Sequence, residues 1–207
     1  MTDFSNASFP STQSDAKRSR LVIAITNPFM WPHVRRGAER MLDDLTRYWL
    51  SQGHCVHVIA LSPKHVEQSS TSSLHTTHCV PQKIFGKFRQ LNACHQAAFS
   101  FQPILARIGE TLDIVHCLNY FDAYAALQVR RRFGFRYRVL FQSVGIPTRS
   151  YFRSIPLDWY FFRQVLKSAD GIITLSTFAH DYLLRDFQSP SVILPPPVDI
   201  NRFSILL

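Results

Sequence analysis

The sequence predicts an α/β fold built on a doubly wound, parallel sheet. Short apolar runs rich in Val, Ile and Leu alternate along the chain with segments of helical spacing, which is the order expected of a parallel sheet. The runs lack strict polar alternation, so both of their faces should be buried under helices. A chain of 207 residues with 46% hydrophobic residues is long enough for one substantial core, which predicts a single domain.

Six apolar runs are expected to form strands. They cover residues 21–26, 55–61, 113–117, 137–141, 171–175 and 191–194. The clearest helix begins at Ala38, because apolar and charged residues segregate there at helical spacing, and Gly53 should end it. Helical spacing returns over residues 83–107 and in the aromatic segment 151–167. The Ser-, Thr- and His-rich residues 62–78 predict an exposed loop.

Both ends of the chain differ from its middle. Residues 1–19 are polar and lack the charged start and apolar run of a secretory signal, so they predict a disordered tail before a domain at 20–197. Three prolines at 195–197 cannot continue a helix or a central strand. We therefore expect residues 198–207 to be the truncated start of an interdomain connection. No apolar run reaches the roughly 18 residues that span a bilayer, which favours a cytoplasmic protein.

The basic composition indicates phosphate-bearing partners. The formal net charge is +9 and the isoelectric point is about 9.8, values that attract a nucleotide, a nucleic acid or an anionic membrane. A nucleic-acid partner is disfavoured, because no nucleic-acid-binding signature is recognisable. The arginines at 130–132 are typical of a solvated helix end.

Disulfide, metal and dinucleotide sites are not predicted. The four cysteines lie far apart without CxxC spacing. His75, His78 and Cys79 stand together only in a polar stretch, where solvated side chains are usual, so no metal is expected. No GxGxxG fingerprint follows the first strand, and no cofactor is expected. Seven histidines are interpreted as surface or loop residues: His33, His54, His57, His65, His75, His78 and His95.

Four short motifs follow one another in a recognisable order. They are Gly37-Ala-Glu-Arg40 after the first strand, Asp113-Ile-Val-His116 in mid-chain, Ala169-Asp170-Gly-Ile-Ile-Thr-Leu-Ser176 after a long helix, and Pro197-Val-Asp199 with Arg202-Phe203. Ser176 is a candidate cap for the helix that follows it. Taken together over residues 20–203, the motifs resemble the N-terminal domain of glycosyltransferase family 4, the retaining GT-B enzymes.

The resemblance implies a fold and an activity. Such enzymes have two Rossmann-like domains that face each other across a cleft. The N-terminal domain mainly holds the hydroxyl acceptor, which can be lipid-linked, and the C-terminal domain mainly holds the nucleoside-diphosphate sugar. This chain would be the N-terminal, Rossmann-like half of a GT-B glycosyltransferase. It would need a donor-binding domain or subunit as a partner, and it would be inactive alone.

The resemblance also implies roles for individual residues. Gly37 would approach the donor phosphates from the acceptor side. His116 would lie at the cleft floor near the transferred sugar, as a catalytic candidate. Asn119, Gly145 and Ser176 would stand on the acceptor side of the cleft.

This chain departs from the family pattern at three places. Arg36 stands where the family commonly has a first glycine, which adds charge and bulk near the donor phosphates. Val144 stands where the family often has an acceptor-site histidine, and prolines precede Val198 where Asn-Gly is frequent. For His116 itself, a hydrogen-bonded structural role is as compatible with the residues as a catalytic one.

Two functions of other classes stay open. In a split transferase, this chain would be a non-catalytic subunit that binds the acceptor or docks on a membrane, while a separate protein binds the donor. As a stand-alone module, it would bind phosphate at Gly37 without a partner. Calorimetry distinguishes the two functions, because only the stand-alone module should bind nucleoside diphosphates strongly by itself.

Membrane docking gives the first testable prediction. Basic and aromatic residues alternate at Lys83, Phe85, Lys87, Phe88 and Arg89, a mixture that suits a helix lying on an anionic membrane, although a helix that buries its aromatic side chains explains it as well. We expect the protein to co-sediment with anionic vesicles and not with neutral ones. Replacing the three basic residues by glutamine should abolish this binding. Equal binding to both vesicles, or to neither, would contradict electrostatic docking.

Overall fold

An eight-stranded sheet runs through the centre of the molecule. The computed structural model describes residues 20–62, 68–81, 93–145 and 148–196. The predicted tail at 1–19, the basic and aromatic cluster at Lys83, Phe85, Lys87, Phe88 and Arg89, and the predicted connection at 198–207 lie outside the described residues. No helix in the described part of the chain is both long and apolar enough to cross a membrane.

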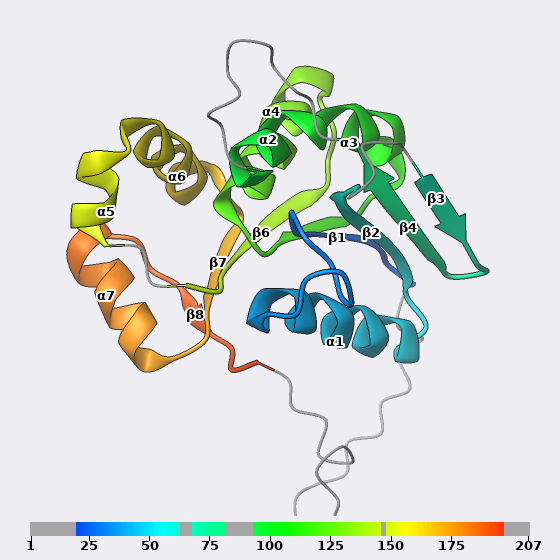
Figure 1. Ribbon diagram of the computed structural model, residues 1–207, viewed down its shortest axis with the longest axis horizontal. Coiled ribbons are helices and arrows are strands. Elements are labelled where there is room, and N and C mark those ends of the chain that lie inside the picture. Colours follow the sequence, from blue (N-terminus) through cyan, green and yellow to red (C-terminus); the bar gives the residue numbers. More distant parts are fainter. Residues whose placement is uncertain (1–19, 63–67, 82–92, 146–147, 197–207) are drawn as a thin grey trace, which may run out of the picture.

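The sheet is almost entirely parallel, as the sequence predicts. Its strands lie in the order β3-β4-β2-β1-β5-β6-β7-β8, and only β3 runs antiparallel to its neighbour (Figure 1). The strands are β1 (Val22–Thr26), β2 (Cys55–Leu61), β3 (Gln68–Thr71), β4 (His75–Val80), β5 (Ile114–Cys117), β6 (Arg138–Ser143), β7 (Gly171–Thr174) and β8 (Val192–Ile193). All six strands expected from the sequence are present.

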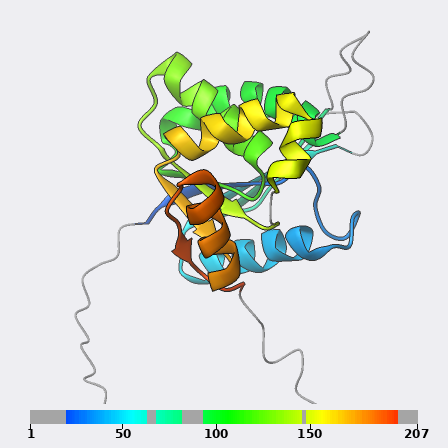
Figure 2. The same cartoon turned by 90° about the vertical axis from the view of Figure 1, so that its left-hand side faces the viewer.

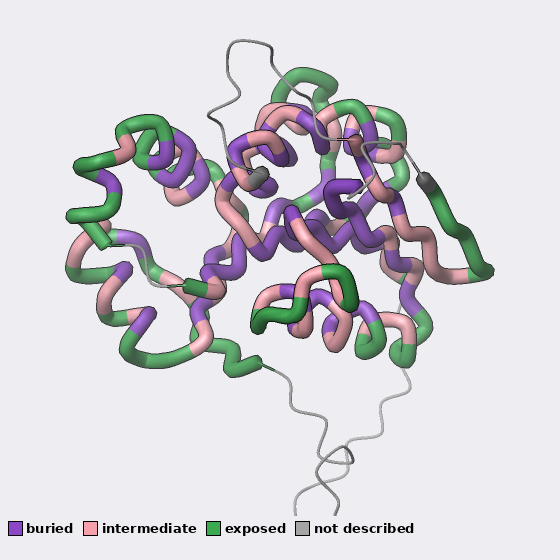
Figure 3. The backbone as a smooth tube through the Cα atoms, in the orientation of Figure 1, coloured by how far each residue is buried: buried purple, intermediate pink, exposed green. Residues whose placement is uncertain are grey.

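Helices cover both faces of the sheet, which confirms the predicted α/β architecture. They are α1 (Gly37–Ser51), α2 (Ala93–Ser100), α3 (Gln102–Ile108), α4 (Tyr120–Phe133), α5 (Arg149–Ser154), α6 (Pro156–Ser168) and α7 (Thr177–Phe187), with a 3-10 turn at Gly109–Thr111. Helix α1 lies against one face, and α2, α4 and α6 lie against the other (Figure 2). The central strands β1, β2, β5 and β6 are largely buried, whereas the outer helix surfaces and the edge strands β3 and β8 are exposed (Figure 3).

Helix α1 shows how local sequence sets one of these layers. Met41, Leu42 and Leu45 recur at helical spacing and pack with Ile23 and Ile25 of β1 in one apolar cluster. The helix ends before Gly53, whose φ of +80° is a conformation that other residues rarely adopt. The predicted terminator is therefore confirmed.

The loop predicted for residues 62–78 is wrong. These residues include β3 and most of β4, and β4 pairs with β2 from His75 opposite Val56 to Val80 opposite Leu61. β-branched threonines favour the extended conformation. Strand β4 was not recognised in the sequence because most of its residues are polar. Polar residues are tolerated there because the strand lies toward an edge of the sheet and is only partly buried.

Three histidines interpreted as surface residues are in fact buried. They are His54, His78 and His95, with exposed fractions of 8%, 7% and 7%. His54 Nδ1 accepts a hydrogen bond from the Leu21 backbone N–H at 3.2 Å. His78 lies 3.1 Å from a ring nitrogen of His57, so polar contacts make its burial tolerable.

The aromatic segment 151–167 is two helices rather than one. Helix α5 ends at Ser154, and α6 begins at Pro156. Between them Ile155 has φ −133° and ψ 80°, outside the helical region. A proline disfavours the helical conformation in the residue before it and is itself well placed in the first turn of a helix. Pro156 therefore sets a corner between α5 and α6.

Asp170 joins the sheet to α4 and gives a prediction for stability. Its Oδ2 accepts a hydrogen bond from the Val139 backbone N–H at 2.7 Å, and Arg130 of α4 donates to the same oxygen. Asp170→Ala should lower the free energy of unfolding by about 1–3 kcal/mol, because the strand N–H loses its acceptor and the guanidinium loses its ionic partner, keeping only the Tyr137 and Ser168 carbonyl oxygens. Urea denaturation measures the difference. The exposed Asp181→Ala is the matched control and should change the stability by less than about 0.5 kcal/mol; equal effects would contradict this role.

Candidate functional site

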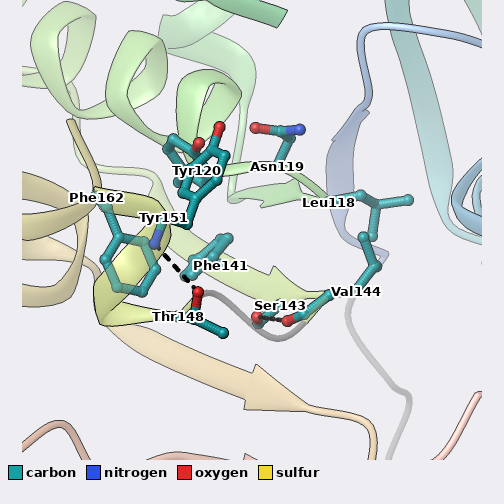
Figure 4. A pocket seen from close by; sticks show the side chains of 10 residues that line it. Leu118, Asn119, Tyr120, Phe141, Ser143, Val144, Thr148, Tyr151 and Phe162 are labelled. Atoms are coloured by element: carbon teal, nitrogen blue, oxygen red, sulfur yellow. Dashed lines mark hydrogen bonds between the residues drawn. The ribbon is translucent and has the colours of Figure 1, made fainter. Parts of the chain in front are cut away.

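A cavity of about 390 Å³ opens where β5 and β6 end. Parallel strands leave their loops at one edge of the sheet, and ligands of open α/β folds bind outside the carboxyl ends of the strands. The cavity is lined by the end of β6, the connections that follow β5 and β6, and helices α4, α5 and α6 (Figure 4). Ten described residues form this lining: Leu118, Asn119, Tyr120, Phe141, Ser143, Val144, Gly145, Thr148, Tyr151 and Phe162. We call this the aromatic cavity.

Helix starts shape the rim of the aromatic cavity. Asn119 caps α4, because its Oδ1 accepts a hydrogen bond from the Phe121 backbone N–H at 3.1 Å. Thr148 caps α5 in the same way, with its Oγ1 accepting from the Tyr151 N–H at 3.2 Å. The caps fix both side chains at the edge of the cavity.

A second hollow adjoins the first and contains charged side chains. It measures about 280 Å³ and shares Asn119 and Val144 with the aromatic cavity. Its other walls come from the β1–α1 loop, the start of α1 and α2: Asn27, Pro28, Phe29, Arg36, Ala38, Glu39 and Cys94. Arg36 pairs with Glu39 at 3.2 Å, although the Arg36 side chain is 63% exposed. We call this hollow the charged compartment.

A buried carboxylate holds two tyrosines of the aromatic cavity. Asp158 of α6 is fully buried, and its Oδ2 accepts hydrogen bonds from the hydroxyls of Tyr120 at 2.8 Å and Tyr151 at 2.5 Å. His95 Nε2 of α2 lies 2.5 Å from the other oxygen. Burial, followed by these hydrogen bonds, raises the pKa of Tyr120 and of Tyr151, so both phenols keep their protons. Four helices thus meet at one carboxylate.

Two further ionisable groups, Asp122 and Cys94, interact near the wall of the charged compartment that Cys94 forms. Burial raises the pKa of Asp122 well above its usual range, which favours its neutral form. Burial also raises the pKa of the Cys94 thiol to about 11, with Asp122 and Asp158 adding to the effect and Arg36 opposing it. Cys94 is therefore a thiol near neutral pH rather than a nucleophilic thiolate.

His116 lies beneath the site rather than in it. Its side chain is 4% exposed, and Nε2 lies 2.8 Å from Oε1 of Gln142 on the neighbouring strand β6. Burial lowers the pKa of His116 to about 4, against a small opposing effect of the Gln142 hydrogen bond. The residue is therefore neutral near pH 7.

The structure brings only some of the predicted site residues together. Asn119 and Gly145 both line the aromatic cavity. Gly37 is exposed at the start of α1, between two residues that line the charged compartment. Ser176 caps α7 through the Ala179 N–H at 3.3 Å, as predicted for the helix, but it does not line either hollow.

Sequence reasoning missed the group around Asp158. Tyr120 and His95 are 38 and 63 residues away from it in the sequence, so no local spacing links them. The available signal was a single acidic residue among the aromatic residues of an otherwise apolar helix face. The described residues contain no group of three or more His, Cys, Asp or Glu side chains that could hold a metal ion.

His116 gives a prediction for the pH dependence of stability. Its pKa in the folded protein, about 4, lies below the ordinary 6.5, so the unfolded chain binds the proton first as pH falls. This stabilising contribution is complete above pH 6.5 and is lost toward pH 4, by roughly 3 kcal/mol. Urea denaturation of His116→Gln should show a shallower loss of stability over this interval than the original protein. Parallel pH profiles of the two proteins would contradict the prediction.

Comparison with known proteins identifies the family of this chain. The family model of Glycosyltransferase Family 4 matches residues 35–202. A search of curated protein sequences finds no significant match.

Similar solved structures share the fold at low sequence identity. Sucrose-phosphate synthase from Thermosynechococcus elongatus aligns with a TM-score of 0.68 and 14% identity, over 88% of this chain and 49% of that one. The catalytic domain of starch synthase IV from Arabidopsis thaliana, bound to ADP and acarbose, aligns with a TM-score of 0.62 and 14% identity, over 89% and 53%. Trehalose-6-phosphate synthase OtsA aligns with a TM-score of 0.59 and 12% identity, over 90% and 51%.

The chain spans about half the length of each of these three GT-B glycosyltransferases. Its parallel sheet with helices on both faces corresponds to a single Rossmann-like half of their fold. Because the family match also extends over most of the sequence, the protein belongs to Glycosyltransferase Family 4.

Proposed function

We propose that this chain is the acceptor-binding half of a retaining GT-B glycosyltransferase. The complete enzyme would transfer a sugar from a nucleoside diphosphate to an acceptor hydroxyl. One observation carries the proposal: in a chain of this family, the aromatic cavity and the charged compartment lie side by side at the carboxyl edge of the sheet. A transferase needs two such adjoining sites, one for each substrate.

The charged compartment suits the donor side. Helix α1 begins there, and the backbone N–H groups of its first turn carry a partial positive charge that attracts phosphate. At Gly37 an added Cβ would meet no atom within 4 Å, so the backbone is open to an approaching ligand. Arg36 replaces a family glycine, and its exposed guanidinium would add a charge-assisted contact to the diphosphate.

The aromatic cavity suits the acceptor side, where Asn119 and Gly145 contribute to its wall. Ser176 would act through the start of α7. His116 would support the floor of the cleft through Gln142 as a neutral group. Retaining transfer of this class does not require a covalent nucleophile from the protein. Orientation of the substrates and stabilisation of the departing diphosphate would supply most of the rate enhancement.

Turnover should depend on a donor-binding half. We expect the purified 207-residue chain to release no nucleoside diphosphate from UDP-glucose or ADP-glucose and to bind UDP and ADP only weakly in calorimetry. Activity should appear when a donor-binding half is present, either in the same polypeptide or as a separate protein. Sugar transfer by the chain alone would refute the proposal, and tight nucleotide binding by the chain alone would favour a stand-alone module.

Substitution of Arg36 tests whether the charged compartment binds the sugar donor. In the active enzyme, Arg36→Ala should raise KM for the nucleotide sugar about tenfold or more, because one charge-assisted hydrogen bond is lost. Arg47→Ala is the matched control on the same helix, since Arg47 pairs with Asp43 outside both hollows. Initial rates over a range of donor concentrations give the KM values of both variants. Equal KM values for the two variants would remove Arg36 from the donor site.

A further inference from the structure

The hydrogen bonds around Asp158 determine which polar atoms the aromatic cavity can offer. A phenol has one proton, and the Tyr120 and Tyr151 hydroxyls both use theirs on Oδ2 of Asp158. Their oxygens therefore keep only acceptor capacity for a ligand. In Figure 4 the two hydroxyls lie close together on the same side of the cavity.

The remaining hydroxyls follow a similar pattern. Ser143 Oγ donates its proton to the Gly145 carbonyl oxygen at 2.7 Å. Thr148 Oγ1 already accepts from the Tyr151 N–H and shares a hydrogen bond with Ser150. These hydroxyls suit a ligand that donates hydrogen bonds, as sugar and alcohol hydroxyls do, and the amide nitrogen of Asn119 adds a donor for the oxygen of such a group.

Charge leads to the same conclusion. None of the ten described residues that line the aromatic cavity is a lysine, arginine or histidine, and Asp158 lies directly behind the two tyrosines. An anionic ligand would lose its water there without gaining a cation. Arg36 lines the adjoining charged compartment instead, and Arg149, which follows Thr148, donates a hydrogen bond to the Asp186 carbonyl oxygen.

The walls between these polar atoms are apolar. Leu118, Phe141, Val144 and Phe162 line the cavity together with the two tyrosine rings. Such walls favour the burial of a hydrocarbon or of the apolar face of a sugar ring.

We propose that the aromatic cavity binds an uncharged hydroxyl acceptor with an apolar body and rejects phosphorylated or carboxylated acceptors, and that Asp158 is the positioning residue behind this choice. The inference rests on the proposed function, since it specifies the acceptor class of that site. Asp158 acts through the tyrosines and does not itself contact the ligand.

Three probes test the acceptor class by calorimetry on the purified chain. Hexyl β-D-glucopyranoside carries an apolar body, methyl β-D-glucopyranoside lacks one, and glucose 6-phosphate is anionic. We expect the hexyl compound to bind at least about tenfold more tightly than the methyl compound, and glucose 6-phosphate to bind most weakly. Equal affinities for the two glucosides, tighter binding of glucose 6-phosphate, or no binding of the hexyl compound would overturn the proposal.

Variants show whether the binding takes place in this cavity. Gly145→Leu should abolish hexyl glucoside binding, because the leucine side chain would fill open space at the cavity wall. At Gly145, no atom lies within 4 Å of an added Cβ. Tyr151→Phe should weaken binding several-fold by removing one acceptor oxygen, while the exposed Tyr48→Phe serves as its control. Unchanged binding in Gly145→Leu and Tyr151→Phe would overturn the assignment.

Asp158→Asn tests the positioning role. With an amide in place of the carboxylate, the two tyrosine hydroxyls can rotate and point their protons at a ligand. The ratio of the affinity for hexyl glucoside to that for glucose 6-phosphate should therefore fall several-fold. Asp122→Asn is the matched control, because Asp122 is also fully buried but lies outside the cavity lining. If both variants keep the original preference, Asp158 has no positioning role. If Asp158→Asn does not fold, the comparison of Tyr151→Phe with Tyr48→Phe decides.

The inference and the proposed function fail in different ways. If the enzyme with its donor half transfers sugar to glucose 6-phosphate and not to hexyl glucoside, the function holds and the acceptor class is wrong. If the probes bind as expected and no sugar is transferred with any donor half, the cavity assignment holds and the transferase function is wrong.

Discussion

Burial of both faces of the parallel sheet is the constraint on which the remaining structure depends. Because helices cover β1, β5 and β6 on both sides, most of their side chains fill the core, and the β6 residues that line the aromatic cavity, Phe141 and Ser143, lie at its carboxyl end. Polar chemistry is then confined to the ends of the strands. Even a polar strand residue such as His116 is held neutral and is satisfied by a neighbour within the sheet. The two hollows therefore form where the loops leave the carboxyl edge.

At that edge, electrostatics separates two neighbouring environments. The charged compartment combines a helix start with Arg36, whose guanidinium lies 5.1 Å from the centre of the Phe29 ring and pairs with Glu39. The aromatic cavity next to it contains hydroxyl groups, the Asn119 amide and apolar groups, and the Asp158 side chain is hidden behind its tyrosines. Among the described residues, only Asn119 and Val144 line both hollows. The proposed site for an anion and the proposed site for a neutral ligand are therefore direct neighbours.

Features that depend on local sequence could be predicted, whereas features that depend on distant partners could not. The six apolar strands, the end of α1 at Gly53 and the Ser176 cap each follow from neighbouring residues. Strand β4 was missed because its half-buried position lets polar residues occupy it. In the site, Asn119 and Gly145 were found by resemblance, but the Asp158 group was not. Its members are brought together only by the packing of α2, α4, α5 and α6.

The corner at Ile155 and Pro156 sets the position of Tyr151 relative to Asp158. In one continuous helix, residues seven positions apart would lie about 10 Å from each other along the axis, and the Tyr151 side chain would lean toward the N-terminus, away from Asp158. The corner changes the direction of α5, and the Tyr151–Asp158 contact forms. One wall of the aromatic cavity thus depends on a short connection, so a change in the length or angle of that connection would reshape the cavity while the sheet and the charged compartment keep their structure.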